Sequence, residues 1–166
     1  YDPHKQTELH CDASSSGFGA VLLQRQLDGK YHPVMFFSRA ITAAEMRYHS
    51  FELETLAIIY ALRRFRVYLQ GIQFKIVTDC NSLMLTLGRK QLNVRIARWA
   101  LELEDYNYTI QHRGGITMGH VDALSRYPTA GTGNFVDACT AVVENRSKLG
   151  KCEFIAAIDS EEIDFY

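Results

Sequence analysis

An acidic residue lies in the middle of the apolar face of the longest helical pattern in the chain. In residues 48–69, YHSFELETLAIIYALRRFRVYL, the side chains of Ile58, Phe65 and Tyr68 fall within about 40° of Glu54 when each residue advances by about 100°. Buried carboxylates are rare unless they are paired or bind a metal ion. Two alternatives follow. Either Glu54 pairs with a nearby arginine or lies in a frayed helix end, or it faces other acids and a metal ion.

The other patterns before Pro128 alternate between strand and helix. The expected strands cover residues 7–14, 18–26, 31–38, 72–79 and 107–113, and the expected helices cover residues 48–69, 80–88, 94–106 and 121–127. Three successive strands on short turns indicate an antiparallel meander. Thr42 and Glu45 form a capping-box pattern that predicts the start of the long helix, and Gly71 predicts its end. The order β-β-β-α-β-α-α-β-α favours an α/β mixed sheet flanked by helices.

The character of the sequence changes after Pro128. The stretch PTAGTGN reads as a linker, and the acidic residues beyond it show no firm periodicity. A chain of 166 residues, 47% of them hydrophobic, is long enough for one domain with a core and a tail. We therefore expect a domain over residues 1–128 and a connector over residues 129–166. Because the first residue is Tyr rather than Met, we expect a piece of a longer protein.

Composition argues against several classes of protein. No apolar run approaches the about 20 residues of a membrane span, so we expect no membrane partner. The cysteines form no CxxC pair, which argues against a zinc cluster or a disulfide framework and favours free thiols in a reducing compartment. They are Cys11, Cys80, Cys139 and Cys152.

The net charge of −1 does not indicate a nucleic-acid-binding protein, but the charges are unevenly distributed. Residues 60–100 contain Asp79 as their sole acid, and the balance turns acidic after Pro128. The bases in this stretch are Arg63, Arg64, Arg66, Lys75, Arg89, Lys90, Arg95 and Arg98. A basic patch can follow a phosphate backbone, and an ordinary solvated surface explains it equally well.

Three further acids are placed where they can join Glu54. Asp12 ends the first strand, Asp79 ends the fourth, and Asp122 begins the last helix. Sites in α/β sheets gather at the carboxyl ends of strands, and clustered carboxylates need divalent cations to ionise together. Hard oxygen ligands suit Mg²⁺ or Mn²⁺. Taken singly, Asp12 could instead cap a turn, Asp79 could cap a helix, and Asp122 could be a first-turn acid.

Several blocks of the sequence together resemble a known family. LHCDASSSGFGAVLLQ, FKIVTDCNSL, RWALELEDYNYTIQHR and HVDALSRYP, with the long helical block between the first two, occur in order over residues 2–128. They are similar to the ribonuclease H domain of gypsy-type LTR retrotransposon (retrovirus-like) Pol polyproteins. The resemblance implies a ribonuclease H-like fold: a five-stranded mixed sheet, with its first three strands antiparallel, flanked by helices.

The resemblance also implies the site. Asp12, Glu54, Asp79 and Asp122 would be its four metal-binding acids, holding two Mg²⁺ or Mn²⁺ ions. His112 would help to activate water or to release product. Nucleic acid would be bound by the remaining candidates, whose backbone or basic side chains would approach the hybrid. These are Ser14, Ser15, Ser16, Gly17, Asn81, Arg89, Lys90, Arg95 and Arg98.

The implied activity is an endonuclease that hydrolyses the RNA strand of RNA–DNA hybrids by two-metal-ion catalysis. The implied partners are the hybrid, a reverse transcriptase domain upstream and an integrase downstream. The implied location is intracellular: cytoplasmic in a virus-like particle, or nuclear. Two alternatives stay open: an inactive, domesticated scaffold or nucleic-acid clamp on this fold, and an integrase- or resolvase-like nuclease. All four acids are present and "HVDALSR" ends the domain, which favours ribonuclease H.

Overall fold

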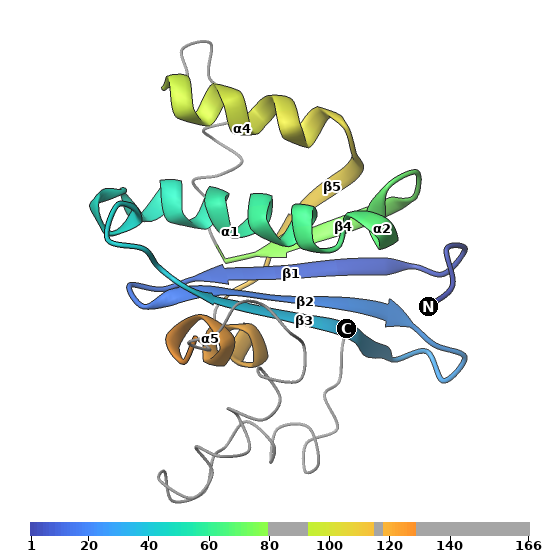
Figure 1. Cartoon of the computed structure of the whole chain (residues 1–166). Helices are drawn as coiled ribbons and strands as arrows, with labels where there is room; N and C mark the ends of the chain where they lie inside the picture. Colours follow the sequence, from blue (N-terminus) through green and yellow to red (C-terminus); the bar gives the residue numbers. More distant parts are fainter. Residues whose placement is uncertain (80–92, 115–117, 129–166) are drawn as a thin grey trace, which may run out of the picture.

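A five-stranded mixed sheet organises the protein (Figure 1). The computed structural model describes residues 1–79, 93–114 and 118–128. Its strands run in the order β3-β2-β1-β4-β5, with β1, β2 and β3 antiparallel and with β4 parallel to both β1 and β5. The strands are β1 (Thr7–Ala13), β2 (Gly17–Arg25), β3 (Tyr31–Ala40), β4 (Gln73–Thr78) and β5 (Asn107–His112). The predicted fold class and the antiparallel meander are confirmed.

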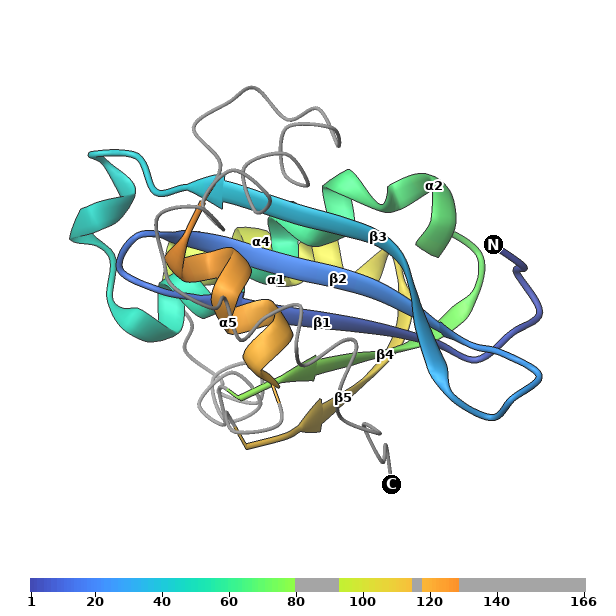
Figure 2. The same cartoon turned by 90° about the horizontal axis from the view of Figure 1, so that it is seen from below.

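Helices cover both faces of this sheet. Helices α1 and α4 lie on one face, and α5 crosses the other, as the view from below shows (Figure 2). The helices are η1 (Glu45–Arg47, a 3₁₀ turn), α1 (Ser50–Arg64), α2 (Arg66–Leu69), α4 (Val94–Glu104) and α5 (Gly119–Arg126). The larger core lies under α1 and includes Leu9, Leu22, Ile58, Leu62 and Ile76. A smaller core lies under α5 and includes Val21, Val77, Val121 and Leu124.

The prediction of one long helix over residues 48–69 is wrong in its bounds. The chain enters α1 only at Ser50, where the side chains and backbone of His49 and Glu52 form a capping box. It leaves α1 at Phe65, whose φ of −99° and ψ of 14° are not helical, and resumes as α2. Phe65 and Leu69 are both fully buried. Packing of these two side chains accompanies the break between α1 and α2. The helical periodicity of the sequence does not predict this break.

Two other expectations about helix ends have different outcomes. The Thr42–Glu45 pair does form reciprocal hydrogen bonds, but these lie at the entry to η1, whose N-cap is Ala44, and not at the start of the long helix. Gly71 follows α2 with a φ of +84°, a conformation that favours glycine, as predicted. The expected helix over residues 80–88 and the connector over residues 129–166 lie outside the described residues. No helix in the described part of the chain is long and apolar enough to cross a bilayer.

An ion pair between a partly exposed arginine and a buried glutamate stabilises the connection from β3 to α1. Arg39 donates to Glu45 Oε2, which also accepts from the Thr42 backbone at 2.9 Å, while Tyr60 donates to Glu45 Oε1 at 2.7 Å. The Arg39 guanidinium lies 4.1 Å from the centre of the Tyr60 ring. Burial alone would raise the pKa of Glu45, but the hydrogen bonds from Arg39, Thr42 and Tyr60 hold it at about 2.

We expect Glu45→Gln to lower the free energy of unfolding at neutral pH by about 2–4 kcal/mol, because Arg39 loses its buried anion. The folded pKa lies below the ordinary 4.5, so this stabilisation is present above about pH 4.5 and is lost as the pH falls toward 2. Urea unfolding of both proteins at neutral and acidic pH tests this.

The matched control is Glu102→Gln, which breaks an exposed ion pair with Arg63 and should cost no more than about 1 kcal/mol. Equal losses in the two variants, or a Glu45→Gln difference that is independent of pH, would contradict the structural role of Glu45.

Candidate metal centre

Three acids from different elements meet at the carboxyl ends of the central strands β1 and β4. Strands β1 and β4 run in parallel with His10 opposite Val77, and each chain segment reaches an acid two residues later, at Asp12 and Asp79. Helix α1 lies over β1 on one face of the sheet and adds Glu54. Each of the three acids offers an oxygen that lies within 4.8 Å of the others. The predicted convergence of Asp12, Glu54 and Asp79 is confirmed.

Glu54 is the least satisfied of these acids. Its Oε2 atom is buried and has no hydrogen-bond partner among the described residues. Burial, followed by the charges of Asp12 and Asp79, raises the pKa of Glu54 to about 8, although a hydrogen bond from the Ala13 backbone opposes the rise. The arginine pairing that the sequence left open for Glu54 is therefore absent among the described residues.

Asp12 is buried, and its pKa is also shifted. Burial and the charges of Asp79 and Asp122 raise its pKa to about 6, against a hydrogen bond from Ser125. Clustered carboxylates of this kind ionise together when a cation joins them. The orphaned oxygen of Glu54 and the all-oxygen donor set fit a hard divalent ion such as Mg²⁺ or Mn²⁺. The cluster can therefore hold a metal ion.

Asp122 is near this cluster but not in it. It lies in the first turn of α5, and its carboxylate oxygens accept from Arg126 Nε at 2.7 and 2.8 Å. Its charge still raises the pKa of Asp12, so the two acids share one electrostatic environment. Its role as a metal ligand stays a prediction.

His112 borders the cluster on the side of β5. It pairs with Thr78 in the parallel register of β4 and β5, and its Nε2 donates to the backbone carbonyl of Asp79 at 2.9 Å. The ring is exposed, as a group that exchanges protons with solvent must be. The structure thus places His112 beside Asp79, and its part in catalysis stays a prediction.

A groove of about 460 Å³ opens beside Glu54. Its lining combines hydroxyl and apolar groups from the β1–β2 turn, the β3–α1 connection and the start of α1. The lining residues are Ala13, Ser14, Ser15, Ile41, Met46, Tyr48, Ser50, Leu53 and Glu54. Two of the predicted nucleic-acid-binding residues, Ser14 and Ser15, are therefore in this groove.

Other residues of the predicted nucleic-acid surface have structural contacts. The Ser14 hydroxyl donates to the Ser125 carbonyl at 2.7 Å and accepts from the Ser16 and Gly17 backbones, which closes the β1–β2 turn. Gly17 is buried, and a Cβ there would lie 2.7 Å from the Arg39 carbonyl. Ser16 is exposed. The glycine thus serves internal packing, and nucleic-acid contact by these residues stays a prediction.

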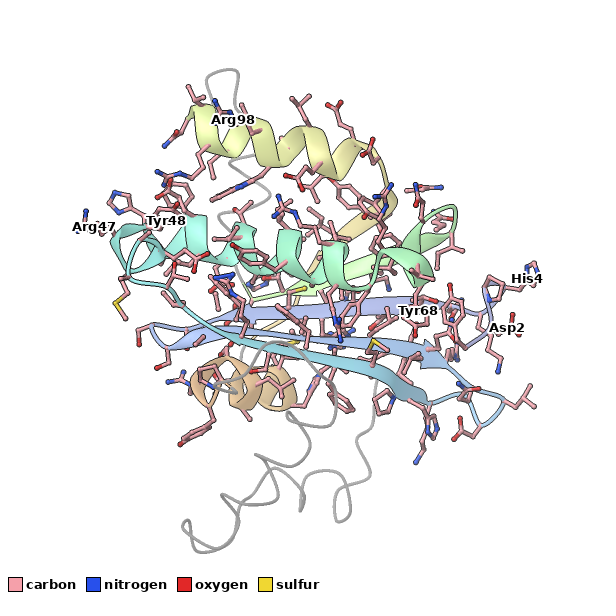
Figure 3. All side chains as sticks on the ribbon, viewed as in Figure 1. Asp2, His4, Arg47, Tyr48, Tyr68 and Arg98 are labelled. Atoms are coloured by element: carbon pink, nitrogen blue, oxygen red, sulfur yellow. The ribbon has the colours of Figure 1, made fainter. Side chains whose placement is uncertain are left out.

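The remaining predicted nucleic-acid-binding residues, which are basic except for Asn81, divide into three groups. Arg95 pairs with Glu52 at 3.1 Å and lies 3.9 Å from the centre of the Tyr48 ring, so it links α4 to the start of α1. Arg98 is exposed on the outer side of α4 (Figure 3). Asn81, Arg89 and Lys90 lie outside the described residues. Of the candidate bases in the described part of the chain, Arg98 has the more accessible side chain.

Two residues that sequence reasoning missed connect α5 to the acids. Ser125 is fully buried and donates to Asp12 Oδ2. Gly19 faces Asp12 across the β1–β2 pair, and a Cβ there would lie 2.6 Å from the Val121 carbonyl and 2.8 Å from the Ser125 nitrogen. The signal for Gly19 was the GFG spacing in a strand, which indicates close approach of another backbone. No local signal marks Ser125.

A family model and known proteins of similar sequence point to the same relationship for this chain. Residues 2–106, which contain Asp12, Glu54 and Asp79, match the family model described as an RNase H-like domain found in reverse transcriptase. The Tf2-3 and Tf2-4 transposon polyproteins of Schizosaccharomyces pombe are each 40% identical over 130 residues, or 76% of this chain. The chain spans about a tenth of the length of these relatives, since the match covers 10% of each.

Solved structures share the fold at low sequence identity. The foamy viral protease-reverse transcriptase in complex with dsDNA is 19% identical, with a TM-score of 0.56, over 68% of this chain and 24% of that one. RNase H1 from the halophilic archaeon Halobacterium salinarum NRC-1 is 17% identical, with a TM-score of 0.54, over 72% of this chain and 93% of that one. At these identities the likeness establishes the fold alone.

Proposed function

Because the chain belongs to the RNase H-like domains found in reverse transcriptases, we propose that it is an endonuclease for the RNA strand of RNA–DNA hybrids. The observation that carries the proposal is Glu54. Its carboxylate is turned toward the carboxyl ends of β1 and β4 beside Asp12 and Asp79 and leaves one buried oxygen without a partner among the described residues. A carboxylate oxygen left unpartnered at such a place is accounted for by a cation.

The chain's own acids would hold the ions. Asp12, Glu54 and Asp79 would bind one divalent cation, and Asp12 with Asp122 would bind a second. The Asp122–Arg126 pair is exposed and screened by solvent, so a cation can displace Arg126 at little cost. When bound, such ions supply an activated water and stabilise the leaving oxygen of a phosphodiester. His112, beside Asp79 and exposed, can take up or deliver a proton at its ring nitrogens.

The groove beside Glu54 would receive the substrate. Hydroxyls of Ser15 and Ser50 and the ring of Tyr48 line it, and these groups suit the 2′-hydroxyl-bearing edge of an RNA strand in the wide minor groove of a hybrid. Structural neighbours described in complex with RNA/DNA hybrid, the foamy viral enzyme and LC11-RNase H1, are compatible with this substrate class. We propose the same class of nucleic acid for this chain.

The domains that would flank this chain are proposed by analogy with its relatives. In a polyprotein of their kind we propose a reverse transcriptase domain upstream and an integrase downstream of this chain, with residues 129–166 as the connector. An intracellular location, cytoplasmic or nuclear, belongs to the same proposal. The polymerase domain would supply much of the grip on the hybrid, because the net charge of this chain is only −1.

The test uses an end-labelled RNA–DNA hybrid with Mg²⁺ or Mn²⁺, and single-stranded RNA and DNA duplex for comparison. We expect cleavage of the RNA strand of the hybrid only, and complete loss of cleavage with chelator. Asp79→Asn should reduce the rate by about a hundredfold or more, because it removes one member of the cluster.

The control is Asp105→Asn, an exposed acid at the end of α4, which should cleave like the parent. Equal cleavage by Asp79→Asn and the parent, or cleavage that survives chelation, would show that this acidic cluster is not the site of cleavage. A parent that neither cleaves the hybrid nor binds Mn²⁺ would overturn the proposal and favour a scaffold. A parent that binds Mn²⁺ without cleaving would show that the metal site is intact and that this chain needs the polymerase domain to hold the hybrid.

A further inference from the structure

We propose that Ser125 is a positioning residue for the metal centre: its buried hydroxyl holds the Asp12 carboxylate in the orientation that binds a cation. This inference rests on the proposed function, because it assumes that Asp12 is a ligand. Its basis is the contact of the Ser125 hydroxyl with Asp12 Oδ2, made by a side chain with no exposed surface.

The Ser125 hydroxyl has a choice of acceptors. Its oxygen also lies 2.9 Å from the Asp122 backbone carbonyl, one turn earlier in α5. A hydroxyl carries one proton and can donate to one acceptor fully. A carboxylate is a stronger acceptor than a carbonyl, so the proton goes to Asp12 when that acid is ionised. Asp12 can accept this bond at Oδ2 and still offer lone pairs to a cation.

The backbone of Ser125 is held so that the side chain cannot move away. The Ser14 hydroxyl donates to the Ser125 carbonyl at 2.7 Å, and the Ser38 hydroxyl donates to the Leu124 carbonyl at 2.8 Å. These two carbonyls belong to the last turn of α5, where helix carbonyls have no partner within the helix. The β1–β2 turn and β3 therefore each hold the C-terminal end of α5 through a hydrogen bond.

The absence of a side chain at Gly19 completes the arrangement. Gly19 is the residue opposite Asp12 on β2, and the Ser125 nitrogen lies where a Cβ of residue 19 would be in conflict. The close approach of α5 to β2 is what brings Ser125 within reach of Asp12. A hydroxyl carried on a rigid, closely packed helix loses little entropy when it binds a carboxylate.

A merely structural role makes a different prediction. If Ser125 served only to satisfy its own buried hydroxyl through the Asp122 carbonyl, alanine would change stability and leave cation binding unaffected. Ser38 provides a matched comparison, because it is a buried serine whose hydroxyl binds the same turn of α5. Its acceptor is the Leu124 backbone carbonyl rather than an acid of the cluster.

The experiment is calorimetric titration of the full chain with Mn²⁺, comparing the parent with Ser125→Ala, Ser125→Cys and Ser38→Ala. We expect Ser125→Ala to weaken Mn²⁺ binding about tenfold, as for other residues that orient a metal ligand. Ser125→Cys, a weaker donor of similar shape, should fall between it and the parent. Ser38→Ala should remain within about twofold of the parent, although it loses a buried hydrogen bond.

Thermal unfolding without metal accompanies each titration, and none of these substitutions adds a large group to the core. Equal loss of affinity in Ser125→Ala and Ser38→Ala would overturn the inference, because general docking of α5 would then explain it. Unchanged affinity in Ser125→Ala, with a parent that binds Mn²⁺, would also overturn it while leaving the proposed function standing. A parent that binds no Mn²⁺ would overturn both.

Discussion

Glu54→Gln is expected to abolish cleavage of the hybrid and, at the same time, to stabilise the metal-free protein. The activity should fall by about a hundredfold or more, because the amide is a poor substitute for an anionic ligand. Stability should rise because the carboxylate is half-buried beside Asp12 and Asp79 with one oxygen unpartnered among the described residues. An amide is neutral and has no comparable cost for losing water.

The pH dependence of folding stability gives the sign of the stability change in Glu54→Gln. The pKa of Glu54 is raised to about 8 from 4.5, chiefly by burial, so the folded state holds a proton that the unfolded state has released. The contribution of Glu54 to the folding stability of the metal-free parent therefore falls as the pH rises from about 4.5 to about 8, whereas the lowered pKa values of His10 and His120 act in the opposite direction. Glu54→Gln should remove much of this slope and gain about 1–3 kcal/mol at the alkaline end, while the raised pKa of Asp12 leaves a smaller slope.

Thermal unfolding in the presence of chelator, at about pH 5 and about pH 8, measures this difference. Glu104→Gln, which changes an exposed acid of α4, is the control and should follow the parent at both pH values. If Glu54→Gln and the parent give parallel pH profiles, Glu54 does not have the raised pKa that its burial beside Asp12 and Asp79 implies. Added Mn²⁺ should stabilise the parent more than the variant, because a ligand that binds the folded state stabilises it.

Gly19→Ala is expected to destabilise the protein strongly. A Cβ at this position would lie 2.6 Å from the Val121 carbonyl, 2.8 Å from the Ser125 nitrogen and 2.9 Å from Leu124 Cβ. Two of these atoms are backbone, so the added methyl cannot be accommodated by a change of rotamer. Helix α5 must move away from β2, at a cost of about 3 kcal/mol or more.

The displacement should also reach the metal centre. Asp12 lies opposite Gly19, and Ser125 and Asp122 both travel with α5. We therefore expect Gly19→Ala to lower the urea midpoint and to weaken Mn²⁺ binding by about tenfold in the fraction that remains folded.

Gly119→Ala is the matched control for this prediction. Gly119 begins α5, and a Cβ added there would meet no atom of the described residues within 4 Å. Alanine at this position should therefore be neutral or stabilise by up to about 1 kcal/mol through its helix propensity. A Gly19→Ala protein as stable as the parent would show that α5 does not depend on the close approach to β2.

Much of the fold was predictable because local patterns and topology agree. The run of strands on short turns determines the β1–β2–β3 meander, and the period of α1 determines that Glu54 faces the sheet. Asp12 and Asp79 follow strands that become parallel neighbours, which is why their meeting could be inferred from the positions of the acids at strand ends.

Other features depend on contacts between residues far apart in the sequence. Glu8, His10 and His120 illustrate this: His10 lies between the other two, with its ring nitrogens 2.9 Å from Glu8 and 3.0 Å from His120, and β1 is buried on both faces. Arg95, predicted to bind nucleic acid, is paired with Glu52 of another helix. No pattern within either segment indicates these partners.

The convergence of Asp12, Glu54 and Asp79 could be inferred from local patterns, because each of these acids follows a strand or lies on a helix face whose phase is local. How these acids are held depends on tertiary packing. Ser125 reaches Asp12 because Gly19 lets α5 approach the sheet, and Arg126 engages Asp122 beside the cluster. The physical reason is that periodicity specifies the direction of a side chain from its own backbone, whereas the distance between two elements is set by the packing of every residue between them.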